Sequence, residues 1–156
     1  KDVPSALLLT RQSVPVLNHS IDRVVDGVSR GAYAVIEEEN PELVFLATGS
    51  EVSLAMEVAY NMSDKRIRVV SMPCWEIFEK QSSDYKVSII PTRGSMKISF
   101  EAGITLGWER YTGSNGLSIG IDHFGASAPG KDLAEEFGFT AEKIESRIRN
   151  YLKKLL

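Results

Sequence analysis

The hydrophobic residues of this 156-residue chain fall into short continuous runs, separated by polar or glycine-containing segments. The clearest run is LVFLA at residues 43–47, and such runs are typical of strands in a parallel sheet covered on both faces. The runs predict strands at residues 5–10, 32–36, 43–47, 67–72, 96–100 and 117–121. The sequence therefore predicts a sheet of several short strands.

Between these runs, apolar residues spaced three and four apart predict helices. One such face repeats after residue 50 at Val52, Ala55 and Ala59, and Ser50 is expected to cap this helix. The predicted helices are residues 51–62, 75–80, 83–90, 131–137 and 140–156, with a bent or broken helix over 103–112. Strands that alternate with helices predict an α/β fold, a three-layer α/β/α domain with a mostly parallel, about five-stranded mixed sheet.

The strand expected at residues 5–10 does not belong to this pattern. It ends in Arg11, and the next forty residues build no partner sheet around it. We therefore interpret residues 1–30 as the last strand of a preceding domain followed by an irregular interdomain linker, and residues 31–156 as a second domain. A signal-peptide layout is absent from the first residues, and the start without Met is consistent with a fragment.

Composition narrows the class of protein. Hydrophobic residues make up 43% of the chain, charged residues 25%, and the net charge is −3. No basic footprint for nucleic acid is present, and the apolar runs are too short to span a bilayer. Cys74 is the only cysteine, and His19 and His123 are too scattered to indicate a metal site. We expect a cytoplasmic globular protein.

Candidate chemistry lies where strands end. Arg11 follows the first predicted strand, and a guanidinium at a strand tip suits a phosphate. The turn after residue 47 contains Gly49 and resembles an anion-binding turn. A small residue is, however, also favourable in any ordinary turn between a strand and a helix. Asp122, His123 and Ser127 suggest a catalytic triad, but adjacent Asp and His side chains point at each other poorly.

Two further functions remain open from the residues alone. The expected strand ends near Ser50, Pro73, Glu101 and Asp122 form an edge that suits a small ligand, so the chain could be a binding or regulatory module. The C-terminal helix and the aromatic loops could instead bury surface against another domain or a second subunit.

Several segments, taken together and in order, resemble one family. They are LLLTRQSVPVL at 7–17, GAYAV at 31–35, NPELVFLATGSEVSLA at 40–55, IRVVSMP at 67–73, FEAGI at 100–104 and GIDHFGASAPGKDLAEEFGFT at 120–140. This order and these strings resemble the C-terminal portion of transketolase. The related dihydroxyacetone synthase remains an alternative.

The resemblance implies the transfer of a two-carbon ketol unit between sugar phosphates in the pentose phosphate pathway. It also implies thiamine diphosphate and a divalent cation, Mg or Ca, held by N-terminal and middle domains across a homodimer. Those domains are missing here, apart from the strand at residues 5–10. The resemblance assigns Arg11 to the terminal phosphate of the substrate and gives this chain no catalytic, cofactor-binding or metal-binding residue. We expect the fragment alone to be inactive.

Overall fold

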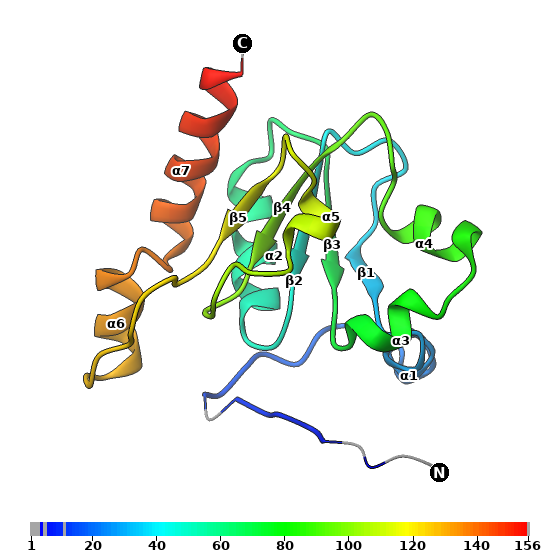
Figure 1. Cartoon of the computed structure of the whole chain (residues 1–156), viewed down its shortest axis with the longest axis horizontal. Coiled ribbons are helices and arrows are strands. Elements are labelled where there is room, and N and C mark those ends of the chain that lie inside the picture. Colours follow the sequence, from blue (N-terminus) through cyan, green and yellow to red (C-terminus); the bar gives the residue numbers. More distant parts are fainter. Residues whose placement is uncertain (1–3, 5, 11, 156) are drawn as a thin grey trace.

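A computed structural model describes residues 4, 6–10 and 12–155, and it shows one five-stranded sheet with helices on both faces (Figure 1). The strands are β1 (Tyr33–Ile36), β2 (Leu43–Ala47), β3 (Ile67–Ser71), β4 (Met96–Phe100) and β5 (Leu117–Ile119). Their order is β1-β3-β2-β4-β5, in which β1 is antiparallel to β3 and the other pairs are parallel. The predicted mixed, mostly parallel α/β sheet is confirmed.

The helices follow the predicted alternation, with one addition. They are α1 (Ile21–Ser29), α2 (Glu51–Asn61), α3 (Trp75–Glu79), α4 (Ser83–Ile89), α5 (Glu109–Thr112), α6 (Gly130–Glu136) and α7 (Ala141–Lys154). The predicted helix over 103–112 is reduced to α5, because the chain turns at Gly107 with a φ of +95°. The predicted cap of α2 is wrong, since the Ser50 hydroxyl donates to the neighbouring Glu51 carboxylate instead.

The core consists of two layers on opposite faces of the sheet. Every residue of β2 is buried, and alternate side chains enter alternate layers. Phe45 packs in the layer under α2 and α7, where Ile144 and Ile148 are fully buried. Leu46 packs in the other layer with Phe78 and with residues of α3–α5. Each such buried side chain contributes about 1.5–3 kcal/mol. This two-sided burial explains the continuous apolar run at residues 43–47.

The segment before β1 departs from the irregular linker that we predicted. Residues 21–29 form α1, and the Ser20 side chain accepts a hydrogen bond from the Arg23 backbone N–H at its start. Ile21, Val25 and Val28 lie on one face of α1, and these three residues are 72%, 60% and 45% exposed, respectively. This spacing is itself a helix signal, but it leaves an apolar face that no described residue covers. The position of the domain boundary stays a prediction.

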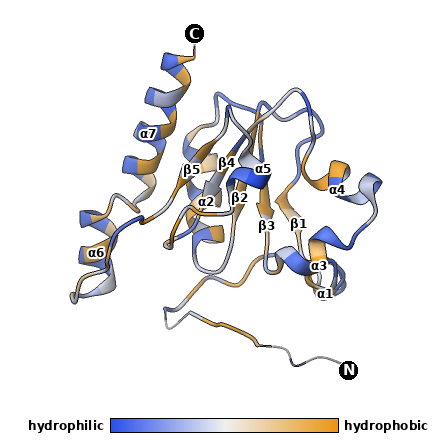
Figure 2. Cartoon of the chain, viewed as in Figure 1, coloured by the Kyte–Doolittle hydropathy of each residue, from blue (hydrophilic) through white to orange (hydrophobic). Residues whose placement is uncertain are grey.

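The strand predicted at residues 5–10 was assigned to the sheet of a preceding domain, and that assignment stays a prediction. Residues 6–10 form no strand, and Leu7, Leu8 and Leu9 are 83%, 89% and 78% exposed. Figure 1 shows this segment running extended below the sheet, and Figure 2 shows its hydrophobic colouring. A strand requires hydrogen bonds from a neighbouring strand, and none of the described strands lies beside this segment.

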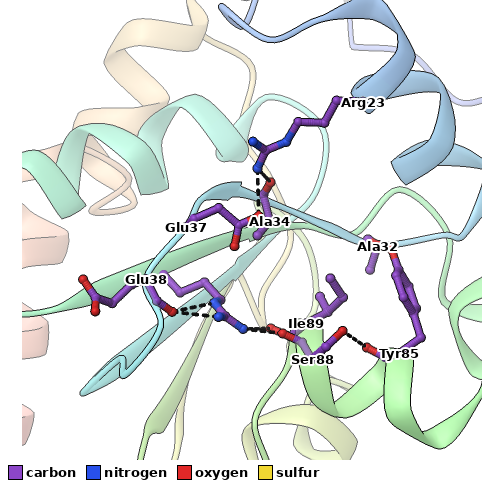
Figure 3. A network of polar contacts seen from close by, with 9 residues as sticks. Arg23, Ala32, Ala34, Glu37, Glu38, Tyr85, Ser88 and Ile89 are labelled. Carbon is purple, nitrogen blue, oxygen red and sulfur yellow. Dashed lines mark hydrogen bonds and ion pairs between the residues drawn. The ribbon is translucent and has the colours of Figure 1, made fainter.

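A polar network ties β1 and β3 to the helices around them (Figure 3). Arg68 of β3 is only 8% exposed and donates to the backbone carbonyls of Glu38, Ser88 and Ile89. Arg23 of α1 donates to the carbonyl oxygen of Ala34 at 2.7 Å. These contacts satisfy backbone acceptors beyond the sheet ladders, so they stabilise the edge of the sheet.

Candidate functional site

Polar side chains gather at the carboxyl end of the sheet, where β2, β4 and β5 stop. The turn after β2 contains Gly49, whose φ of +57° allows the chain to enter α2 directly. Glu51 opens α2, and its carboxylate accepts the backbone N–H of Ala102 at 3.2 Å. The carboxylate thus ties this turn to the loop after β4. Because it already supplies negative charge at the start of α2, it disfavours the anion-binding interpretation of the turn.

A cavity of about 890 Å³ lies beside these loops. Ser50, Leu54 and Ala102 line one side, and Lys131 and Phe137 of the α6 region line the other. Of the four strand-end residues that we predicted for a ligand crevice, Ser50 is part of this lining, whereas Pro73, Glu101 and Asp122 are not. Most of the residues that line the cavity are apolar, and few of them are charged.

Glu101 has a structural partner. Its carboxylate accepts a hydrogen bond of 2.6 Å from the indole N–H of Trp108, which is 1% exposed. The Trp108 ring lies against Trp75 at 4.8 Å and near Tyr111 at 6.2 Å, both edge to face. These aromatic side chains pack in the core layer on one face of the sheet, and Trp108 ties the Glu101 carboxylate to that layer.

Asp122, His123 and Ser127 do not form the catalytic triad that the sequence already disfavoured. The Asp122 carboxylate accepts hydrogen bonds from the backbone N–H of Thr105 at 2.8 Å and from the Thr105 hydroxyl at 3.0 Å. The backbone bond first, and then the hydroxyl, hold the pKa of Asp122 below its usual value. His123 instead contacts the carbonyl oxygen of Phe124 through Nδ1 at 2.9 Å. Asp122 therefore joins two loops and does not orient the imidazole.

The same loops require a glycine at position 120. A Cβ at Gly120 would lie 2.6 Å from the Thr105 methyl carbon and 2.7 Å from the Gly103 carbonyl oxygen. This close approach brings Thr105 within reach of Asp122. Of the residues in this contact, the sequence suggested only Asp122, because Thr105 lies 17 positions away and has no local motif.

Arg11, the predicted phosphate ligand, lies outside the described residues. Its neighbour Gln12 is described, and it lines the carboxyl-end cavity together with Pro15. Gln12 and Pro15 therefore lie at the same edge of the sheet as the turn after β2 and α6. This placement does not test the role of Arg11.

The described residues provide no ligand cluster for a metal ion: no group of three or more His, Cys, Asp and Glu side chains is suitably placed. Among the helices that the structure describes, none is both long enough and apolar enough to cross a membrane.

The mixed sheet, its two helical layers and the cavity beyond its strand ends define a three-layer α/β domain. Residues 31–140 match the family model of the transketolase-like C-terminal domain. The chain therefore belongs to the transketolase family, in which it corresponds to the C-terminal part.

Comparisons with individual proteins agree with this assignment. The chain is 48% identical over 151 residues to the transketolase of Staphylococcus aureus strain MW2, which covers 95% of this chain and 23% of that protein. It is 44% identical over 156 residues to the transketolase of Halalkalibacterium halodurans, with coverage of 98% and 23%. A solved Pichia stipitis transketolase in complex with sedoheptulose 7-phosphate is 32% identical, with a TM-score of 0.82 over 92% of this chain and 20% of that one. The chain thus spans about a quarter of the length of these relatives.

Proposed function

We propose that this chain is the C-terminal part of a transketolase, an enzyme that moves a two-carbon ketol unit between sugar phosphates. The observation that carries the proposal is the 48% identity to a transketolase over 95% of the chain. The names of the matched relatives favour transketolase over dihydroxyacetone synthase. The complete protein would act as a cytoplasmic homodimer in the pentose phosphate pathway.

The chain supplies a docking surface rather than the reacting groups. Its α1 face, formed by Ile21, Val25 and Val28, is exposed, and so are the three leucines at residues 7–9. Apolar surface of this kind is stable when it is covered. The chain corresponds to 23% of the S. aureus relative, so the remaining three quarters of that protein lie outside the matched part, and we propose that the preceding domains cover both surfaces.

Thiamine diphosphate and its divalent cation would be held by those other domains. The described residues offer no suitable cluster of metal ligands. The turn after β2 contains a single glycine, and the Glu51 carboxylate opens the helix behind it. These groups do not suit a diphosphate.

Arg11 is proposed to bind the terminal phosphate of the substrate. A guanidinium offers two parallel N–H donors to phosphate oxygens, which gives both charge and direction. Binding energy at the far end of a substrate helps to position the reacting carbons. Support comes from the resemblance of the LTRQ segment and from Gln12, which lines the carboxyl-end cavity.

A chimera tests the proposal. We would replace the corresponding C-terminal quarter of the S. aureus transketolase with this chain and assay ketol transfer from a ketose phosphate donor. We expect the chimera to be active and the isolated chain to be inactive, because the cofactor domains are absent from the latter. The S. aureus protein truncated before this segment is the control. Turnover by the isolated chain, or a folded, cofactor-loaded chimera without activity, would contradict the proposal.

The same chimera tests Arg11. We expect Arg11→Gln to raise KM for phosphorylated donors about 10- to 100-fold, since a charged hydrogen bond contributes about 1.5–3 kcal/mol. An unphosphorylated donor should be unaffected. Arg93→Gln is the matched control, because Arg93 is exposed and forms no salt bridge with a carboxylate of the described residues. Equal losses for both kinds of donor would show that the assignment of Arg11 is wrong.

A further inference from the structure

Strand β4 differs from β2 because polar side chains occupy one of its faces. Ile98 and Phe100 pack in the layer under α2 and α7. The alternate residues, Lys97 and Ser99, therefore face the opposite layer, where α3–α5 lie. A strand with apolar cover on both faces is continuously hydrophobic, as β2 is. The alternating sequence MKISF thus indicates that β4 does not make a purely apolar contact with the layer of α3–α5.

A cleft of about 580 Å³ lies over this polar face, and residues of α4 and α5 line it. Its lining includes Lys97 at the start of β4 and Gly116 just before β5, so it lies at the amino ends of these strands. The carboxyl-end cavity lies at the other end of the same strands. The volume falls within the range of about 300–1,000 Å³ that is usual for small-molecule sites.

The charged groups that line the cleft are mostly cations: Lys86, Lys97 and Arg110 against one carboxylate, Glu79. Glu79 is already bonded to Lys86 at 3.0 Å. The Lys97 ammonium donates to the Ser95 carbonyl oxygen at 2.8 Å, and no carboxylate of the described residues forms a salt bridge with it. Burial lowers the pKa of Lys97. The chain as a whole carries a net charge of −3, so this positive cluster is a local feature.

One hydroxyl group in the same lining has no hydrogen-bond partner among the described residues. It is the Ser95 Oγ, and this atom is buried. Burial first, and then a side-chain hydrogen bond to the Glu79 carboxylate, raise the pKa of Tyr111, so its hydroxyl stays protonated at neutral pH. Buried polar atoms in native structures normally have partners, so the Ser95 hydroxyl points to a group that the chain itself does not supply.

We infer that this cleft binds a small organic oxyanion, a carboxylate or phosphate ester on a compact apolar body. The Lys97 ammonium and the Ser95 hydroxyl would donate to the oxyanion, and the exposed Arg110 guanidinium would add positive charge beside it. Phe78 and Ile90, which also line the cleft, would pack against the apolar body. The inference rests on these groups alone and is independent of the proposed transketolase activity.

The test is an NMR titration of the ¹⁵N-labelled chain with phenyl phosphate, benzoate and, as a cationic control, benzylamine. We expect saturable shifts at Lys97 and at residues 113–116 with one or both anions, and none with benzylamine. The two anions decide between a phosphate and a carboxylate ligand. Lys97→Met should weaken binding about tenfold or more, because it removes a charged donor. Lys80→Met, an exposed lysine outside the cleft, should not change the affinity.

Several results would overturn the inference. They are an absence of saturation with both anions at millimolar concentration, equal shifts with benzylamine, or shifts that map to the carboxyl-end cavity. If Lys97→Met loses its dispersed spectrum, Arg110→Gln decides instead, because Arg110 is exposed and its replacement leaves the core intact. Unchanged affinity in that folded variant would also reject the oxyanion site.

Discussion

Arg68 offers the sharpest test of how the edge of the sheet is held. Its guanidinium is 8% exposed and makes four hydrogen bonds to the carbonyl oxygens of Glu38, Ser88 and Ile89 (Figure 3). It thereby joins β3 to the loop after β1 and to the end of α4. The substitution Arg68→Met keeps a long side chain of similar volume and removes every donor, so the effect of a cavity is small.

The magnitude follows from these contacts. A hydrogen bond from a charged donor contributes about 1.5–3 kcal/mol, and removal of the donor leaves its acceptors unsatisfied. The contributions do not simply add, because the buried guanidinium has itself been desolvated. Ser88 is exposed, so its carbonyl oxygen regains water after the substitution. We therefore expect Arg68→Met to lower the free energy of unfolding by about 2–4 kcal/mol.

Urea unfolding of the chain, followed by far-ultraviolet circular dichroism, measures this free energy. For a chain of this length the same change should lower Tm by roughly 4–16 °C. Arg93→Met is the matched control, because Arg93 is exposed, and it should change stability by less than about 0.5 kcal/mol. A loss below about 0.5 kcal/mol for Arg68→Met would refute the role given to the guanidinium.

Two further predictions concern a glycine and a carboxylate. Gly31→Ala should destabilise the chain by about 3 kcal/mol or more, because φ is +83° and the new Cβ would meet the backbone of Cys74. Gly49→Ala, with a φ of +57° and open space, should cost only about 1–2 kcal/mol; equal losses in urea unfolding would contradict the steric argument. Asp122, whose pKa is lowered by Thr105, stabilises the fold above its unfolded pKa of about 3.9, and this contribution disappears as pH falls through the lower folded value. The Asp122→Asn variant should therefore have a lower free energy of unfolding than the parent chain at pH 6, and this difference should disappear as the pH falls below about 4. A difference that does not depend on pH would reject the stabilising role of the carboxylate.

The sequence predicted the sheet well because two-sided burial leaves a local signature. The uninterrupted LVFLA run of β2 and the apolar spacing of α2 are visible within a dozen residues. The prediction failed in the segment before residue 31, where α1 forms in place of an irregular linker. Its spacing of Ile21, Val25 and Val28 was a helical pattern, but the glycines and polar residues around it obscured the signal.

The candidate sites were less predictable. The sequence disfavoured a triad of Asp122 with its neighbours, but it did not reveal that Asp122 is bonded to Thr105, 17 positions away. Arg11, the residue predicted to bind the substrate, lies outside the described residues, and its role stays a prediction. The cation Lys97 could have been noticed from the alternating MKISF strand, which contrasts with the continuous LVFLA run.

By itself, the sequence determined the order and type of most elements and the family to which the chain belongs, because these depend on short-range spacing and on strings of residues. Only the tertiary structure decided which polar groups meet. Val44 of β2 pairs with Arg68 on one side and with Lys97 on the other. One cation is satisfied by backbone carbonyls, and the other faces a cleft. The difference arises because helices far away in the sequence cover this face of the sheet over β3, where Arg68 lies. The same helices leave a cleft over β4, where Lys97 lies.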